Sequence, residues 1–286
     1  MTIKSSGNPL AFSEIETEFG ANGTRSLGSY RLTQSVGTLS NLPLDTGIPT
    51  SGQIKFSDFY GKQLNIVVDC HSGGREDRIT AKNDKWNNNN LTVIGGFRSK
   101  KEGGSKIYIN VNKKFCSDKN NVNNCALKTG SWDSTATVQV DLGSNAKVFG
   151  AGGDGGSGAQ GINNSGSPGG SGTSGLGIDT NNVTVNVASG AIIRAGFGGG
   201  GGGGGGSQQD KNADRRASGG GGGGGAGCPA GNGGPGGSVG AGGGGGSAGT
   251  ETSGGTGGGG GNNANQAYGG RGGDGANLNG NAQNGS

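Results

Sequence analysis

Glycine tracts in the second half of the chain limit the possible folds more than any other feature. Residues 150–286 contain 58 of the chain's 74 glycines. Because glycine has no side chain to bury, this glycine-rich half cannot be held together mainly by a hydrophobic core. The glycines are concentrated in tracts of similar length, separated by short and dissimilar polar inserts: Gly152–Gly158, Gly166–Gly172, Gly196–Gly206, Gly219–Gly227, Gly231–Gly237, Gly240–Gly246, Gly254–Gly261 and Gly269–Gly275.

Two structures are compatible with such tracts. One is a flexible linker, since glycine-rich chains are usually coils and glycine loses the most entropy on ordering. The other is an ordered bundle of polyproline-II helices, in which neighbouring helices pair their N–H and C=O groups. A helix with neighbours on several sides leaves no room for a Cβ atom, as at the collagen axis. Collagen itself is excluded because the sequence sustains no Gly-X-Y register.

Three features favour the ordered bundle. The tracts are similar in length, and the inserts differ from one another, whereas linkers tend to be monotonous. A β-hairpin is also predicted inside the region, with strands at Val183–Val187 and Ala191–Arg194 and a turn at Ala188–Gly190.

Composition and charge argue against several classes of function. Only 27% of the residues are hydrophobic and 5% are aromatic, so one large apolar core is not expected. The net charge of +4 is not gathered into a basic stripe, so we expect no nucleic-acid partner. Residues 1–22 contain no apolar stretch of signal-peptide length, and no segment is long enough to span a membrane. We expect a protein that is made in a cytoplasm and does not insert into a membrane.

No catalytic or metal-binding constellation is predicted. The single histidine, His71, is next to Cys70, but adjacent strand residues point to opposite faces, which argues against a Cys–His dyad. The chain has no CxxC pair of the kind that binds zinc. We therefore expect no enzyme activity, no cofactor and no metal. Cys116 and Cys125 flank a polar loop and can either form a disulfide in an oxidising environment or remain free thiols; both alternatives stay open.

Residues 1–62 are predicted to form a small unit with an internal repeat. Leu10–Ile15 is repeated as Ile54–Phe59, and each copy follows a Ser-Gly pair. In the first copy, Ser13–Glu16 fits the pattern of a helix capping box. The apolar residues are too few for a self-sufficient core, so we expect the unit to fold on a partner or on the next domain.

The segment Ser51–Gly61 resembles short elements that recur in virion proteins of tailed phages. This resemblance implies that residues 1–62 attach the protein to the virion. The residues expected to make the attachment are the apolar residues of the two repeats and the tyrosine that follows them: Phe12, Ile15, Ile54, Phe56, Phe59 and Tyr60.

Residues 63–149 are predicted to be a β-rich middle domain, because apolar residues alternate or run together over strand length and are interrupted by Gly and Asn clusters. A small sandwich or jelly-roll-like domain is expected. The predicted strands are Leu64–Asp69, Leu91–Ile94, Lys106–Asn112 and Thr137–Leu142. Their predicted core comprises Ile66, Val68, Val93, Ile107, Ile109, Val111, Val138 and Val140, with Trp86 and Trp132 packed against it.

The chain from Val138 onward resembles the tail-fibre tip adhesins of T-even-like phages. The resemblance is carried by Val148–Ser157, and by Ser189–Phe197 running into the glycines of 198–206. It implies a mainly β protein with a polyglycine-II helix bundle over residues 150–286 that carries variable receptor-binding loops. Residues 1–62 depart from this family and resemble a different virion element.

If successive tracts alternate in direction, their loops alternate between the two ends of the bundle. The outer loops are then Ala159–Ser165, Ser207–Ser218, Ser238–Val239 and Asn262–Tyr268. The inner connections are Thr173–Ala195, Cys228–Ala230 and Ser247–Ser253, and the C-terminus returns inward. Amide, basic and aromatic side chains of the outer loops are the receptor-binding candidates: Asn163, Asn164, Gln208, Gln209, Lys211, Asn212, Arg215, Arg216, Asn262, Asn263, Asn265, Gln266 and Tyr268.

These observations predict a phage adhesin at a tail-fibre or tail tip. Its expected partners are other tail or fibre proteins, such as the end of a trimeric fibre, and a host receptor that is an outer-membrane protein or a glycan. Two alternatives remain: a structural virion protein with a glycine-rich spacer, and a glycine-rich ice-binding protein. The irregular inserts argue against the ice-binding alternative, which requires a flat and regular face.

Overall fold

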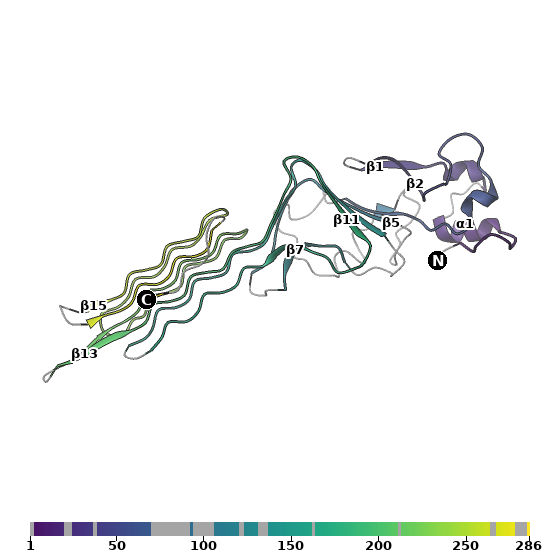
Figure 1. Ribbon diagram of the computed structural model, residues 1–286. Coiled ribbons are helices and arrows are strands. Elements are labelled where there is room, and N and C mark those ends of the chain that lie inside the picture. Colours follow the sequence, from purple (N-terminus) through teal and green to yellow (C-terminus); the bar gives the residue numbers. More distant parts are fainter. Residues whose placement is uncertain are drawn as a thin grey trace.

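The structure is a computed structural model that describes residues 3–19, 25–36, 39–69, 92–93, 106–119, 123–130, 137–161, 164–210, 213–263, 267–277 and 285–286. The molecule is elongated (Figure 1). The N-terminal part lies at one end, a group of short strands follows it, and the glycine tracts extend side by side to the far end. Within the described residues, no helix has both the length and the apolar character needed to cross a membrane.

The N-terminal part has its own apolar core. It contains helix α1 (Phe12–Phe19), the 3-10 helices η1 (Leu27–Tyr30) and η2 (Phe56–Phe59), and the antiparallel strands β1 (Thr33–Val36) and β2 (Leu39–Pro43). The rings of Phe19, Tyr30 and Phe59 meet edge to face in its centre, with centroids 5.7–6.2 Å apart. Leu64 and Tyr108, which lie outside residues 1–62, belong to the same cluster, so this core is completed by the next part of the chain.

The sequence repeat in this part is also a structural repeat. In the first copy, Glu14 Oε2 accepts a hydrogen bond of 2.8 Å from the N–H of Ala11, just before α1. In the second, Asp58 Oδ2 accepts one of 2.7 Å from the N–H of Lys55, just before η2. The predicted capping box at Ser13–Glu16 is wrong, because α1 begins at Phe12 and Ser13 lies inside the helix.

The middle of the molecule consists of short strands that pair mostly in parallel. All four predicted strands are present, as β3 (Ile66–Asp69), β4 (Thr92–Val93), β5 (Lys106–Val111) and β8 (Thr137–Leu142). Further strands join them: β6 (Lys114–Cys116), β7 (Cys125–Lys128), β9 (Lys147–Phe149), β10 (Ser174–Gly177), β11 (Val183–Val187) and β12 (Ile192–Arg194). A sandwich or jelly roll is built from antiparallel strands, so the expectation of such a domain is wrong.

The parallel strands stack as the rungs of a short solenoid. Strand β8 pairs with β5 on one side and β11 on the other, and β9 pairs in the same way with β6 and β12. Strand β10 lies against β7. The predicted hairpin at residues 183–194 is wrong, because β11 and β12 each pair with a strand of the preceding rung. Residues 188–190 form the corner between two sheets, where Gly190 has a φ of 94°.

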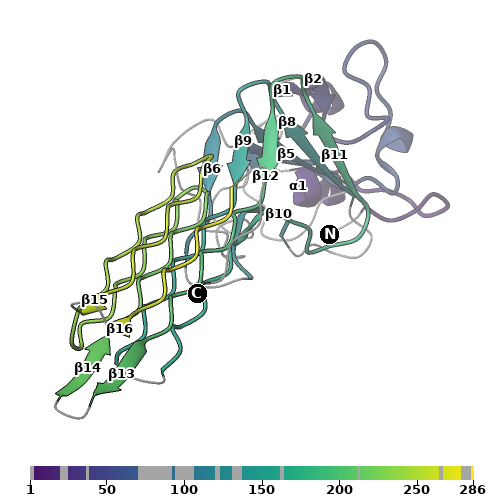
Figure 2. The ribbon, with the colours of Figure 1, turned by 60° about the vertical axis from the view of Figure 1, so that its left-hand side comes forward.

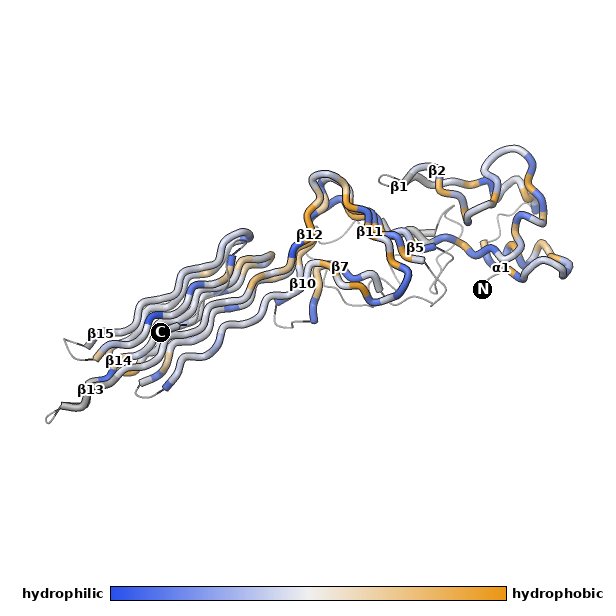
Figure 3. The backbone as a smooth tube through the Cα atoms, in the orientation of Figure 1, coloured by the Kyte–Doolittle hydropathy of each residue, from blue (hydrophilic) through white to orange (hydrophobic). Residues whose placement is uncertain are grey.

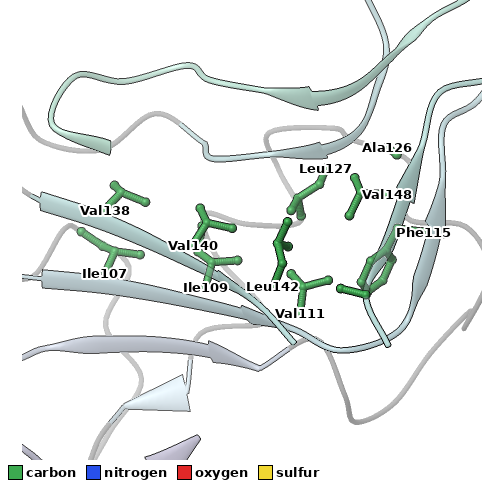
Figure 4. Packing of buried hydrophobic residues seen from close by; sticks show 11 residues of the cluster. Ile107, Ile109, Val111, Phe115, Ala126, Leu127, Val138, Val140, Leu142 and Val148 are labelled. Carbon is green, nitrogen blue, oxygen red and sulfur yellow. The ribbon is translucent and has the colours of Figure 1, made fainter. Parts of the chain in front are cut away.

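The inward-facing residues of these rungs form the second apolar core (Figure 4). The register places Ile107 beside Val138, and Ile109 beside Val140, and all of these side chains are at most 1% exposed. Val183 and Val185 of β11 pack against the same core, so strands of the glycine-rich half complete it. Among the predicted core residues, Ile107, Ile109, Val111, Val138 and Val140 are confirmed as buried. Trp86 and Trp132 lie outside the described residues.

Backbone hydrogen bonds between the glycine tracts recur at every third residue. Figure 2 shows the tracts running side by side, and the hydropathy colouring of Figure 3 shows few apolar residues among them. In the first tract, one row of N–H groups bonds to one neighbouring tract and the next row to another, at 2.8–3.0 Å. The first row joins Gly152, Gly155 and Gly158 to the carbonyls of Pro229, Asn232 and Pro235, and the second joins Gly153, Gly156 and Ala159 to those of Phe197, Gly200 and Gly203.

The tract Gly219–Gly227 lies at the centre of this bundle and is buried throughout. It shares backbone hydrogen bonds with six other tracts, through the pairs 222–156, 200–223, 231–225, 221–244, 258–221 and 223–273 (donor first). A side chain does not fit here. A Cβ atom on Gly222 would lie 2.0 Å from the carbonyl oxygen of Gly200, which is far inside van der Waals contact.

The pairing register of the strand stack continues directly into the glycine tracts. Strands β9 and β12 pair in parallel, with Phe149 opposite Arg194. Immediately after them, the N–H of Gly150 donates to the carbonyl of Arg194, and that of Gly153 donates to Phe197, both at 2.8 Å. The pairing of β9 with β12 therefore fixes the relative position of the first and third tracts at their base.

The first prediction concerns the packing of the central tract. The substitution Gly222→Ala should lower the free energy of unfolding by about 1–3 kcal/mol or more, because the new methyl group overlaps backbone atoms that cannot move independently. The matched control is Gly259→Ala, where a Cβ meets nothing within 4 Å. We expect this control to change the stability by no more than about 0.5 kcal/mol. Denaturant unfolding of both variants measures the difference, and equal effects would contradict the close packing described here.

Candidate functional site

The described residues of the outer loops predicted from the sequence lie together at the far end of the bundle. Consecutive tracts run antiparallel. For example, the N–H of Gly200 donates to the carbonyl of Gly223 and that of Gly203 donates to Gly220, so the residue numbers increase along one tract and decrease along its partner. The chain therefore returns to the same end after every second tract. Figures 1 and 2 show this end at the labels β13 and β15, distant from the N-terminal part. We call the four loops at this end the tip: Ala159–Ser165, Ser207–Ser218, Ser238–Val239 and Asn262–Tyr268.

Two of the tip loops are β-hairpins. Strands β13 (Gly206–Asp210) and β14 (Ala213–Ala217) pair antiparallel, which places Gln208 opposite Arg215 and Gln209 opposite Asp214. Strands β15 (Asn262–Asn263) and β16 (Ala267–Tyr268) form the second hairpin, with Asn262 opposite Tyr268. From the sequence both segments are predicted to be loops, because polar residues without apolar alternation give no strand signal.

Several candidate side chains are exposed at the tip. The ring of Tyr268 is 63% exposed, and Asn164, Arg216 and Asn262 are also exposed. Strand register places Gln208, Gln209, Arg215 and Asn263 in the hairpins. The remaining candidates, Asn163, Lys211, Asn212, Asn265 and Gln266, lie outside the described residues.

The short turn Ser238–Val239 is a part of the tip that contains none of the predicted binding residues. Val239 is an apolar side chain that is 37% exposed among polar loops. The turn is hydrogen-bonded to two residues that were also missed, Gln160 and the buried Ser218. Nothing in the sequence marks them, because contacts between separate loops become visible only once the tracts are placed side by side.

The opposite end of the bundle is fastened to the strand stack by covalent and ionic contacts. Cys228, in the inner connection between two tracts, forms a disulfide with Cys116 of β6, across a sequence separation of 112 residues. Glu251 of another inner connection forms an ion pair with Lys114, and its carbonyl accepts a hydrogen bond from Arg194. The Arg194 guanidinium also lies over the ring of Phe149, 4.3 Å from its centroid. These contacts fix the base of the bundle.

The alternative of a Cys116–Cys125 disulfide is wrong, because Cys116 is bonded to Cys228. Cys125 is a free and buried thiol in β7. Burial raises the pKa of this thiol, since desolvation disfavours the thiolate, and Lys128 opposes the shift. Cys125 is therefore a poor nucleophile. In the described parts of the chain, no group of three or more His, Cys, Asp or Glu side chains could hold a metal ion.

The chain end does not return inward as expected. The carbonyl of Ser286 accepts a hydrogen bond from Gly204, and its N–H donates to the carbonyl of Arg271, at 3.0 and 2.9 Å. Both partners lie near the outer ends of their tracts. The residues 285–286 therefore lie alongside the outer half of the bundle.

The candidate attachment residues of the N-terminal part separate into two groups. Ile15 and Phe59 are completely buried, so they support the core and are not available to a partner, which corrects their assignment as contact residues. Phe56 is 40% exposed, and Phe12, Ile54 and Tyr60 are partly exposed. The rings of Phe12 and Phe56 meet edge to face at 6.0 Å.

The structure is an elongated scaffold that holds exposed loops at one end. A family model described as phage tail fibre adhesin Gp38 matches residues 76–286, and the chain belongs to this family. The protein is therefore a phage tail-fibre adhesin, as the resemblance predicted. No curated protein matches the chain, and no solved structure matches it.

The second prediction tests the fastening of the bundle. Replacement of Cys228 by serine should lower the free energy of unfolding by about 2–5 kcal/mol, because the disulfide closes a long loop in the unfolded chain. A reductant should destabilise the wild-type protein and leave Cys228→Ser unchanged. The matched control is Cys125→Ala, which should remain sensitive to the reductant. Loss of that sensitivity in Cys125→Ala, with retention in Cys228→Ser, would instead indicate the Cys116–Cys125 pairing.

Proposed function

We propose that the adhesin binds its host-cell receptor through the tip. The observation that carries this proposal is the convergence of the outer loops at the end farthest from the N-terminal part, together with the exposure of Tyr268, Asn164, Arg216 and Asn262 in these loops. Tyrosine and arginine are common anchors of binding surfaces, and amides adapt to both protein and glycan partners. The candidates outside the described residues, Lys211 among them, belong to the same loops.

We infer further that the glycine tracts are polyglycine-II helices packed as a bundle. The hydrogen bonds between neighbouring tracts recur at every third residue, and this supports the inference because the polyproline-II helix has about three residues per turn. The contact of one buried tract with six others supports it as well, since only glycine leaves space for so many backbone neighbours. A stiff scaffold benefits binding because the loops are ordered in advance, and less entropy is lost when the receptor is bound.

The N-terminal part, in this proposal, attaches the adhesin to the virion. Its position opposite the tip supports this role, and so does the partly exposed apolar surface around Phe12, Ile54, Phe56 and Tyr60. The division of the chain into an attachment unit of residues 1–62, a β-rich part of residues 63–149 and a bundle of residues 150–286 remains a proposal. The partners are then another tail or fibre protein at one end and the host receptor at the other, and the protein acts by binding alone.

The third prediction tests the tip. The substitution Tyr268→Ala should weaken binding of the full-length protein to intact host bacteria by roughly tenfold or more, as truncation of a central aromatic anchor does. The melting temperature should stay the same, because the ring is largely exposed. The control is Thr252→Ala, an exposed position in an inner connection, which should bind normally. Equal binding by both variants would contradict the tip as the receptor site.

The fourth prediction tests the attachment surface. We expect Phe56→Ser to reduce incorporation of the adhesin into virions, because it removes an exposed apolar side chain from the attachment surface. Soluble Phe56→Ser protein should still bind host bacteria normally, since the tip is unchanged. Immunoblots of purified particles and cell-binding assays measure the two effects separately. Normal incorporation would show that the virion holds the protein through another surface.

A further inference from the structure

The turn Ser238–Val239 at the tip is held from two sides by side chains of other loops. On one side, Gln160 Oε1 accepts hydrogen bonds from the N–H and the hydroxyl of Ser238, at 3.0 and 3.2 Å. On the other side, Ser218 Oγ accepts a hydrogen bond of 3.0 Å from the N–H of Val239 and donates one of 2.7 Å to its carbonyl. Both backbone groups of Val239 are thus paired with a single buried hydroxyl.

The two holding residues are themselves fixed. The carbonyl of Gln160 accepts a hydrogen bond of 2.6 Å from Asn164 Nδ2 within its own loop. Ser218 directly follows β14 and is 0% exposed. Beyond the turn, the N–H of Ala241 donates to the carbonyl of Arg216 at 3.0 Å. The first outer loop, the hairpin β13–β14 and the Ser238–Val239 turn are therefore one hydrogen-bonded body.

This arrangement leaves an apolar side chain in a fixed position at the surface. Val239 is 37% exposed, although the loops around it are polar. The side chain of Val239 lies over Gly161, because a Cβ atom placed on that glycine would be 3.5 Å from Val239 Cγ1. A β-branched side chain has few rotamers, and its backbone is already held, so contact with a partner would cost little conformational entropy.

We propose that Gln160 and Ser218 are positioning residues of the tip, which hold Val239 in the conformation that contacts the receptor. This inference rests on the proposed function of the tip as the receptor site. It adds a contact residue from the shortest loop, and it assigns to Gln160 an effect on binding that is exerted through the turn.

The test uses the labelled full-length protein and intact cells of a bacterial strain that the phage infects. Gln160→Met keeps the length of the side chain and removes the acceptor, and we expect it to weaken binding about fivefold to tenfold, since the turn then becomes mobile. Gln160→Glu retains an acceptor oxygen at the same place and should bind within about twofold of the wild type. Because Gln160 is exposed, both variants should keep the melting temperature of the wild type.

A double substitution separates positioning from direct contact. Val239→Ser should weaken binding by about tenfold, and Gln160→Met should cause no further loss in that background, because it acts through Val239. Independent, additive effects would overturn the inference by showing that Gln160 contacts the receptor itself. Normal binding by Val239→Ser or by Gln160→Met would also overturn it.

Replacement of residues 208–215 by a two-residue Asn-Gly turn distinguishes this inference from the proposed function. If that variant loses binding while the Gln160 and Val239 variants bind normally, the tip is the receptor site and only the positioning role fails. If all of these variants bind normally, the proposed function fails as well.

Discussion

Backbone hydrogen bonding between glycine tracts takes the place of side-chain burial in half of this molecule. The tracts donate along rows formed by every third N–H group; the first tract has two such rows, to two neighbours, and the central tract Gly219–Gly227 has three, to three neighbours. Such bonds are individually worth little net free energy, but they satisfy polar groups that would otherwise be buried unpaired, and that is the larger penalty. The requirement for glycine follows from the same geometry, since a Cβ on most of the central tract would overlap a neighbouring carbonyl. The spacing of the tip loops depends on this lattice.

The lattice needs a starting register, and strand pairing provides it. Strands β9 and β12 pair in parallel, β9 contributes Val148 to the apolar core, and the tracts continue from the ends of both strands. The Cys116–Cys228 disulfide and the ion pair of Glu251 with Lys114 then bind the inner connections to β6, the strand that pairs with β9 on its other side. The protein therefore combines an apolar core with an interior of hydrogen-bonded glycine backbone, and the strands around the apolar core align the glycine tracts.

Much of this organisation could be predicted from the sequence, and the failures have a common cause. The four strands of the middle part and the alternation of the tracts follow from local pattern and from parity. The pairing of β11 with β8 could not be found in this way, because alternation along Val183–Val187 identifies a strand but not its partner. The same holds for Cys228, which lies 112 residues from Cys116, and for Gln160, whose contact with Ser238 spans 78 residues. In each case the missing information concerns which distant segments lie side by side.

The central position of Gly219–Gly227 also has a consequence for biosynthesis. Two of its hydrogen-bonded neighbours precede it in the chain, and the other four follow it. When a ribosome has just completed this tract, most of its backbone groups have not yet met their partners, which lie in residues that follow the tract. The central tract therefore cannot be fully paired as it is made, and the bundle closes around it only after the later tracts have been synthesised.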